Sequence, residues 1–331
     1  MILNTAGLAA DPALSQFLDK LCDVRVLVAG DAMLDRYWFG DVHRISPEAP
    51  VPVVAVDKND ERAGGAANVA CNIAALGAGC NLIAIVGKDE AADKLEALLH
   101  DRQVETDFIR DSAHVTTVKL RVISRNQQLL RADFEQEPDH GYLARKLECF
   151  GKRLQQADVL LLSDYGKGAL KDVSDMILAG REKDIPVLVD PKGRDFSLYR
   201  GASLITPNRL EFEEVVGACD SMDDIASKAA QLIREIEIDY LLITLSDKGM
   251  ALYDRDGLVY HQPARAKEVF DVSGAGDTVI GTMAAMLGAG ADYQTAVHIA
   301  NAAASIVVGK LGTATVSSEE ILEEIQHEDF A

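Results

Sequence analysis

Short, continuous runs of apolar residues recur along the chain. They lie at 24–31, 82–86, 159–164, 186–190, 203–206 and 240–244. Unbroken runs of this length are typical of strands that are covered on both faces. Between many of them stand helical patterns, at 66–76, 89–99, 142–155, 171–183 and 222–236. The alternation predicts an α/β fold with a central, mostly parallel sheet and helices on both faces.

Two regions break this pattern. Residues 39–56 contain three prolines, which exclude a helix, and residues 115–134 alternate like paired strands. We expect the two regions to form a small antiparallel β lid beside the main sheet. Such a lid closes over a ligand or pairs with another subunit, because an uncovered apolar strand surface is a liability. Residues 1–331 are expected to form a single domain that includes this lid.

A glycine-rich segment near the C-terminus carries the clearest chemistry. Residues 271–277 read Asp-Val-Ser-Gly-Ala-Gly-Asp and precede an apolar helical pattern. Three small residues stand where the helix begins: Gly274, Ala275 and Gly276. Free backbone amides at a helix start attract phosphate. The Asp277 carboxylate would repel that anion, unless its task is to accept a proton from a hydroxyl that attacks the phosphate.

This combination predicts phosphoryl transfer to an alcohol. The alternative is a tight loop in which Asp277 only caps the helix, a role that aspartate fills well. The spacing excludes a dinucleotide fingerprint, since Val279 stands where a third glycine is needed, and no Walker-type loop occurs in the chain.

A second motif, Ala-Gly-Gly-Ala-Ala-Asn at 63–68, opens a helical pattern. Gly64 and Gly65 permit close approach of the backbone to a ligand, and Asn68 both donates and accepts hydrogen bonds, which suits a sugar. The alternative is a small-residue helix packed tightly against the sheet.

Polar residues follow several of the predicted strands: Asp31, Asp164, Asp190 and Asn208. Ligands of open α/β sheets gather at the carboxyl ends of the strands, so these residues are candidates for a site. Asp31 is alternatively an ordinary turn residue.

Charge and composition restrict the partners. A formal net charge of −20 opposes nucleic acid and anionic membranes, and it makes any phosphate site a local one of amides, a few cations and a divalent metal. Five scattered cysteines, none in a Cys-x-x-Cys pair, indicate neither a disulfide framework nor a zinc site. Without a long apolar run or a signal sequence, we expect a cytoplasmic protein.

The two glycine motifs, in this order and at opposite ends of the chain, resemble the signatures of the ribokinase and PfkB sugar-kinase family. Asn208-Arg-Leu-Glu211 is similar to the family's Asn-x-x-Glu element, and residues 242–249 are similar to its nucleotide-side strand and turn. The resemblance extends from about residue 24 to residue 312. It implies a ribokinase-like fold, ATP and Mg²⁺ as cofactors, and a homodimer formed through the lid.

The resemblance also implies roles for individual residues. Asp277 is expected to be the catalytic base, beside an anion hole of backbone amides around Gly274, Ala275 and Gly276. Asn208 and Glu211 are expected at the nucleotide and magnesium, with Glu211 acting through water, although a turn and helix cap explains them too. The remaining assignments at the nucleotide are Ser246, Gly249 and Asn301. The sugar hydroxyls are assigned to Asp31, Gly64, Gly65 and Asn68.

A narrower resemblance rests on residues 31–38, 44–53, 162–168, 189–193 and 271–277. These segments are similar to the heptose-7-phosphate kinases of the ADP-heptose pathway. That family phosphorylates D-glycero-D-manno-heptose 7-phosphate at the anomeric oxygen, for lipopolysaccharide biosynthesis. Many members are fused to a nucleotidyltransferase domain, which we do not expect in a chain that stops soon after residue 312.

The phosphate of such a substrate demands cations on an acidic protein. Lys167, Lys192 and Arg44 are expected to supply them, although each is alternatively a solvated surface residue. Two other functions stay open: a kinase for another sugar or sugar phosphate, such as a fructose phosphate or ribose, and a noncatalytic sugar-binding regulator on the same fold.

Overall fold

The structure is a computed structural model that describes residues 12–125, 127–138, 140–265, 269–310 and 312–328. The larger of its two sheets has nine strands. Their spatial order is β13 (Gly257–Gln262), β12 (Met250–Asp254), β11 (Tyr240–Thr244), β10 (Leu204–Ile205), β9 (Val187–Asp190), β8 (Val159–Ser163), β1 (Arg25–Gly30), β4 (Gly79–Gly87) and β5 (Glu105–Asp111).

All six predicted runs form strands of this sheet, and they pair in parallel. Three strands were not predicted, namely β5, β12 and β13. The edge strands β5 and β13 are largely half-buried or exposed, so polar residues interrupt the apolar run that marks the central strands. Because β12 and β13 pair antiparallel, one edge of the sheet departs from the parallel pattern.

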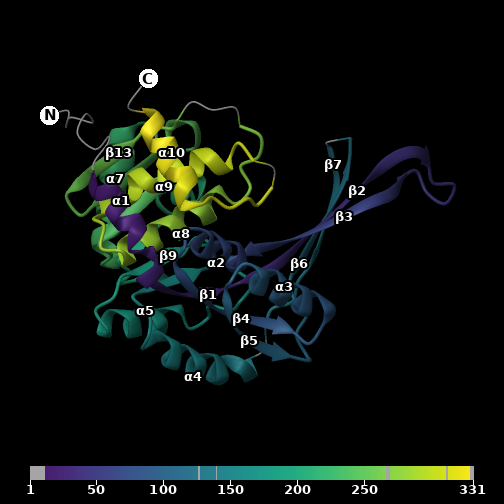
Figure 1. The fold of residues 1–331 in the computed structure, drawn as a ribbon, viewed down its shortest axis with the longest axis horizontal. Helices are drawn as coiled ribbons and strands as arrows, with labels where there is room; N and C mark the ends of the chain where they lie inside the picture. Colours follow the sequence, from purple (N-terminus) through teal and green to yellow (C-terminus); the bar gives the residue numbers. More distant parts are fainter. Residues whose placement is uncertain (1–11, 126, 139, 266–268, 311, 329–331) are drawn as a thin grey trace.

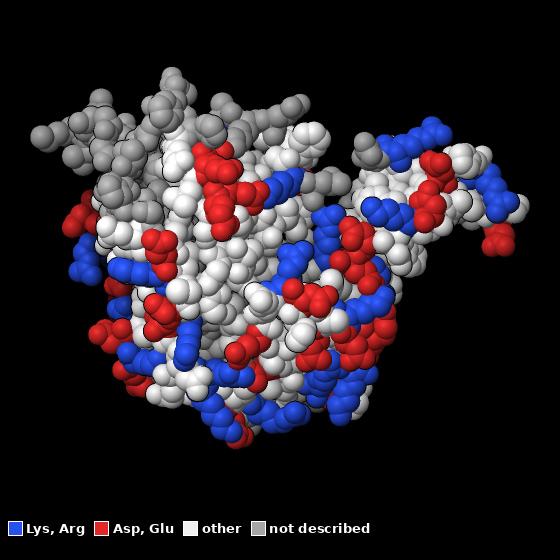
Figure 2. Space-filling view, in the orientation of Figure 1, with Lys and Arg blue, Asp and Glu red and all other residues white. Residues whose placement is uncertain are grey.

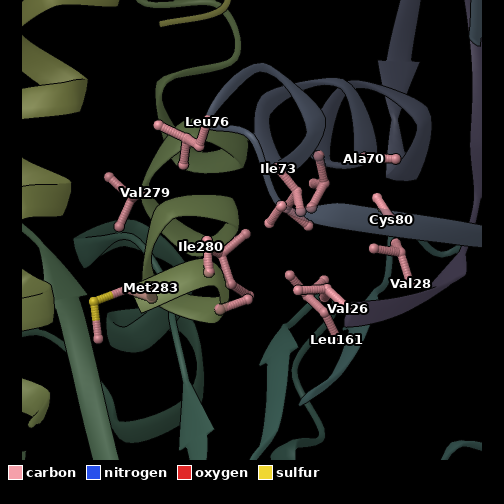
Figure 3. Packing of buried hydrophobic residues seen from close by; sticks show 14 of the residues in the cluster. Val26, Val28, Ala70, Ile73, Leu76, Cys80, Leu161, Val279, Ile280 and Met283 are labelled. Carbon is pink, nitrogen blue, oxygen red and sulfur yellow. The ribbon is translucent and has the colours of Figure 1, made fainter. Parts of the chain in front are cut away.

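Helices cover both faces of the sheet, as predicted. Alternate residues of β1 enter different cores: Val26 and Val28 pack in one, Leu27 and Ala29 in the other. Figure 3 shows the first core, where Val26 and Leu161 of the sheet lie near Ile73 and Ile280 of two helices. The helices are α1 (Pro12–Asp19), α2 (Ala66–Ala75), α3 (Glu90–Asp101), α4 (Leu143–Leu154), α5 (Val173–Glu182), α6 (Arg209–Val216), α7 (Met222–Ile236), α8 (Ala275–Gly288), α9 (Tyr293–Val307) and α10 (Ser318–Glu328).

The second sheet is the expected lid, with strand order β3 (Pro52–Gly65), β2 (Ala32–Ile45), β6 (Val118–Ser124) and β7 (Gln127–Phe134). The β2–β3 ribbon projects far from the rounded body (Figure 1). Two expectations need correction. The first lid segment is longer than 39–56, and β2 pairs with β6 in parallel, because their connection crosses through the body instead of a hairpin.

An ion-pair ring fixes the base of the lid to the body. Arg36 of β2 contacts Glu61 of β3 at 2.6 Å and Glu90 of α3 at 2.7 Å. Lys94 of α3 contacts the same two carboxylates at 2.8 and 2.9 Å. We call these four residues the lid ring, and they leave the outer part of the ribbon unsupported by the body.

Charged side chains of both signs are interspersed over the face seen in Figure 2, including the lid. That face therefore presents no continuous basic surface of the kind that binds nucleic acid. Along the stretches that the structure describes, no helix is both long and apolar enough to cross a membrane.

Candidate active site

The two glycine motifs of the sequence meet in space. Asn68 of α2 donates a hydrogen bond from Nδ2 to Oδ2 of Asp277 in α8, at 2.6 Å. One turn further along α2, Asn72 Oδ1 accepts a hydrogen bond from Oγ1 of Thr278, the residue that follows Asp277, at 3.0 Å. Gly281 of α8 lies against the same turn of α2, where a Cβ would be in van der Waals contact with the Asn72 Cβ at 3.4 Å. Residues that are far apart in the sequence thus form one polar seam between two apolar helices.

The start of α8 needs glycine. Gly274 has φ +80°, and a Cβ at this position would lie 2.8 Å from Asn68 Nδ2. The Ala275 amide donates to the Val272 carbonyl at 3.2 Å, so the turn already uses it. In the part of the chain that the structure describes, the amides of Gly276 and Asp277 donate to no backbone carbonyl. The available amides are therefore those of Gly276 and Asp277, at the positive end of the helix dipole.

Asp277 is a buried carboxylate, only 6% exposed. Tyr165 donates to its Oδ1, as Asn68 does to its Oδ2. Burial raises the pKa of Asp277 to about 6, while the hydrogen bonds from Asn68 and Tyr165 favour the ionised form and limit the rise. The carboxylate accepts side-chain donors and caps no amide of α8, so the geometry favours a proton acceptor over a helix cap.

A cavity of about 270 Å³ opens beside Asp277 at the carboxyl ends of the central strands. Gly274 and Gly276 line it together with Asp277. Three of the four strand-end candidates also line it: Asp164, Asp190 and Asn208. The prediction that polar strand ends gather at one site agrees with this arrangement.

Asn208 and Glu211 line the cavity and also cap α6. Asn208 Oδ1 accepts from the Glu211 amide at 2.9 Å, and the Asn208 amide donates to Glu211 Oε2 at 3.1 Å. The other carboxylate oxygen of Glu211 pairs with Lys192 Nζ at 2.8 Å. Asn208 and Glu211 can therefore cap α6 and still face the cavity.

Carboxylates line this part of the cavity, although among the described residues no group of three or more His, Cys, Asp or Glu side chains is arranged to hold a metal ion. Burial, followed by the carboxylates of Asp277 and Glu211, raises the pKa of Asp190 well above its ordinary value. Among the described residues no side chain donates a hydrogen bond to the Asp190 carboxylate. Crowded carboxylate oxygens are the ligands that Mg²⁺ prefers, and a cation would relieve their repulsion.

The base of the lid also lines the cavity, through residues that the sequence reasoning did not single out. Asp35 of β2 pairs with Arg121 of β6, Oδ1 to Nη1 at 2.7 Å. Lys119, two residues earlier on the same face of β6, makes no ion pair with any described residue, and burial lowers its pKa. The sequence did carry a signal for Lys119 and Arg121. They are basic residues at alternate positions of a predicted strand, on the face opposite to that of the buried Val118 and Leu120.

Asp31 lies outside the lining of this cavity. Its Oδ2 accepts from the amides of Tyr165 and Lys167, both at 2.9 Å, and its Oδ1 accepts from that of Ala169 at 3.0 Å. The carboxylate is thus turned under the loop that follows β8, and its assignment to the sugar stays a prediction. Asp35, four residues later, is the β2 carboxylate that faces the cavity.

Of the two glycines of the first motif, one lines the cavity. Gly65 lines the cavity with φ +57°. A Cβ on Gly64 would lie 2.8 Å from Asp35 Oδ2, so the absence of a side chain makes room for that carboxylate. Asn68, which was expected at the sugar, instead directs its amide nitrogen to Asp277.

Five other candidates do not line the cavity. Lys167 pairs with Glu135 at 2.6 Å, and Arg44 lies near the outer end of β2. Asn301 Nδ2 donates to the Pro263 carbonyl at 3.0 Å. Ser246 and Gly249 form the turn between β11 and β12, where Gly249 is needed because a Cβ would lie 2.0 Å from the Gln262 carbonyl oxygen.

Comparison with known proteins identifies the family of the chain. The model of the pfkB family carbohydrate kinases matches residues 24–321. A protein of Histophilus somni named bifunctional protein HldE is 54% identical over 309 residues, which are 92% of this chain and 64% of that protein. The chain thus spans slightly less than two thirds of the curated relatives that it matches.

Solved structures show the same fold. The ribokinase of Thermotoga maritima has a TM-score of 0.73 at 22% identity and covers 92% of this chain and 99% of its own. The phosphofructokinase-2 of Escherichia coli in complex with potassium has a TM-score of 0.77 at 20% identity over the same shares of the two chains.

Proposed function

Because this chain belongs to the pfkB family of carbohydrate kinases, we propose that it transfers the γ-phosphoryl group of ATP to the anomeric hydroxyl of D-glycero-D-manno-heptose 7-phosphate. The product would be heptose 1,7-bisphosphate, a precursor of ADP-heptose and lipopolysaccharide, made in the cytoplasm. One observation carries the proposal: a buried carboxylate with two free helix-start amides at its side shares a cavity with lid cations.

The reaction uses Asp277 as general base. As the hydroxyl oxygen bonds to the γ-phosphorus, its proton passes to the carboxylate, the bond to the β-phosphate oxygen breaks, and ADP leaves. The amides of Gly276 and Asp277 stabilise the negative charge on the transferring group. Catalysis is then positioning together with electrostatic stabilisation, as phosphoryl transfer generally requires.

The donor side would hold ATP with Mg²⁺. Mg²⁺ would supply positive charge against the phosphates, and Asp190 and Glu211, which line the cavity, would hold it directly or through water. Lys192, paired with Glu211, would lie nearer to the ATP phosphates than to the sugar.

The acceptor side would bind the sugar between Gly65 and Asp35. We assign the substrate's own phosphate to Lys119 and Arg121, since both line the cavity. This assignment replaces the expected Lys167, Lys192 and Arg44.

A homodimer through the lid belongs to the proposal. Several large apolar side chains of the lid are exposed: Trp38, Ile45, Val51, Val56, Leu129, Leu130 and Phe134. Exposed apolar strands favour pairing with a second copy. Light scattering decides between dimer and monomer.

A panel of acceptors tests the function. ADP release is measured with heptose 7-phosphate, unphosphorylated heptose, fructose 6-phosphate and ribose at equal concentrations. Heptose 7-phosphate is expected to give the highest kcat/KM. Preference for another sugar would refute the proposed substrate, and sugar binding without any ADP release would indicate a noncatalytic regulator.

A further inference from the structure

Two side chains from different parts of the chain hold the Asp277 carboxylate. The Tyr165 hydroxyl donates to Oδ1 and the Asn68 amide donates to Oδ2. Donors on both oxygens fix the rotation of the carboxylate about its last side-chain bond. The plane of the proposed base is therefore set before any substrate binds.

The loop that carries Tyr165 is itself held from below. Asp31 accepts three of its backbone amides, those of Tyr165, Lys167 and Ala169. A carboxylate with several amide donors is a strong anchor, because each bond is charge-assisted. The side chain of Tyr165 thus starts from a fixed backbone position.

The groups around Asp277 shift its pKa in opposite directions. Burial raises its pKa first, and the Asp35 carboxylate adds to the rise, whereas Asn68, Tyr165 and the Lys119 ammonium lower it. Asp190, at the end of β9, is a further carboxylate, near enough for Asp277 to raise its pKa.

Tyr165 acts only as a donor in this cluster. Burial, then the carboxylates of Asp277 and Asp190, raise its phenol pKa well above the ordinary value, so the hydroxyl keeps its proton. Its ring also lies beneath the Lys119 ammonium, 5.8 Å from the centroid, which further fixes its position.

We propose that Tyr165 is a positioning residue that orients Asp277 and keeps it ionised, and that Asp31 supports the same carboxylate by fixing the loop that carries Tyr165. The proposal rests on the proposed function, since it concerns the base of that reaction.

The test is the pH dependence of kcat/KM for ADP release. In the wild type the acidic limb is expected near pH 6, with activity lost as the pH falls and Asp277 takes up a proton. Tyr165→Phe removes one hydrogen bond to the charged form, so the limb should move up by about 1–2 pH units. Activity at pH 7 then falls roughly 2- to 10-fold and largely recovers at pH 9.

Tyr199→Phe is the matched control. The Tyr199 hydroxyl donates to Asp164 Oδ2 at 2.8 Å, so it supports the start of the same loop without touching Asp277. The acidic limb of the Tyr199→Phe pH profile should stay at the wild-type pH. If Tyr165→Phe lowered activity equally at every pH, with an unmoved limb, Tyr165 would be merely structural and the proposal would be wrong.

Asp31→Asn tests the role of Asp31 in fixing the loop. The substitution replaces one carboxylate oxygen with an NH₂ donor, which cannot accept hydrogen bonds from the three loop amides. Its limb is expected to move in the same direction as that of Tyr165→Phe, while thermal melting confirms that the variant folds. An unmoved limb would remove Asp31 from the proposal.

A direct titration separates this proposal from the proposed function. The carboxyl carbon of Asp277 is followed by NMR in ¹³C-aspartate-labelled protein and is assigned by its absence from Asp277→Asn. If the wild type released no ADP with any sugar, the function would fail, yet a higher Asp277 pKa in Tyr165→Phe than in Tyr199→Phe would still support the positioning role. Equal pKa values in the two variants would overturn it.

Discussion

The two ends of the cavity are built differently. At the proposed donor end, backbone groups stand beside the carboxylates: a glycine in a left-handed conformation, two amides at the start of α8, and a capped turn before α6. The proposed acceptor end is formed by side chains, those of Asp35, Lys119 and Arg121. They belong to lid strands whose outer part projects from the body.

The difference separates the groups that catalyse phosphoryl transfer from the groups that select the sugar. Amides and helix ends recognise a phosphate whichever sugar receives it, so a family can keep them unchanged. Side chains on lid strands can be exchanged without disturbing the body, and acceptor choice depends on such single contacts. Substitutions at the donor end should therefore affect turnover, whereas substitutions at the acceptor end should affect which sugar is used.

The strongest test of this comparison is Asp277→Asn. Turnover is expected to fall roughly 10²–10⁴-fold with every acceptor, while ATP binding persists, because the proton acceptor is lost and the amides stay. Steady-state ADP release and equilibrium ATP binding measure the two effects. Asp292→Asn, which alters the cap of the neighbouring α9, is the control. Near-normal turnover in Asp277→Asn would rule out the proposed base.

The same substitution should stabilise the fold. The pKa of Asp277 is about 6 in the folded chain and that of an unfolded aspartate is about 3.9, so ionising it costs about 3 kcal/mol of stability above pH 6. This cost is absent below about pH 4, where both states are protonated. Urea unfolding of Asp277→Asn and wild type should differ at pH 8 and converge at pH 4. A constant difference at all pH values would contradict the raised pKa.

At the acceptor end, Lys119→Met should lower kcat/KM for a phosphorylated sugar roughly 10- to 100-fold, the range for losing a charged hydrogen bond. The KM for ATP and the kcat/KM for an unphosphorylated sugar should stay within a few-fold. Lys167→Met is the matched control, since Lys167 pairs with Glu135 outside the cavity. Equal losses with both kinds of sugar would remove Lys119 from the phosphate subsite.

The same contrast explains how much the sequence predicted. Continuous apolar runs mark central strands, so the six runs and the layered fold followed from the pattern, whereas the half-buried β5 and β13 carry no such mark. Backbone features of the donor end are local in sequence and gave a recognisable motif. A strand-end position, however, does not state where a side chain points, so the sequence did not indicate that the Asp31 carboxylate accepts amides of the loop after β8.

The acceptor end could not be assembled from local patterns. Lys119 and Arg121 reach the cavity only because β6 pairs with β2 in parallel, after a crossover through the body. The contact between Tyr165 and Asp277 likewise joins residues 112 positions apart. Long-range pairing of this kind depends on the complete topology, which a single sequence does not display.

The smallest expected effect concerns how the lid is attached. Glu61→Gln removes the carboxylate that contacts both Arg36 and Lys94 in the lid ring, and it should lower the free energy of unfolding by about 1 kcal/mol at low salt.

Since Arg36 follows Asp35 on β2, the sugar KM should also rise a few-fold while the ATP KM stays unchanged. Glu148→Gln breaks a fully exposed pair with Lys152 and serves as the control, with no measurable change expected in either quantity. If Glu61→Gln raised both KM values equally, the lid base would support the whole cavity, and the division between a backbone donor end and a side-chain acceptor end would not hold.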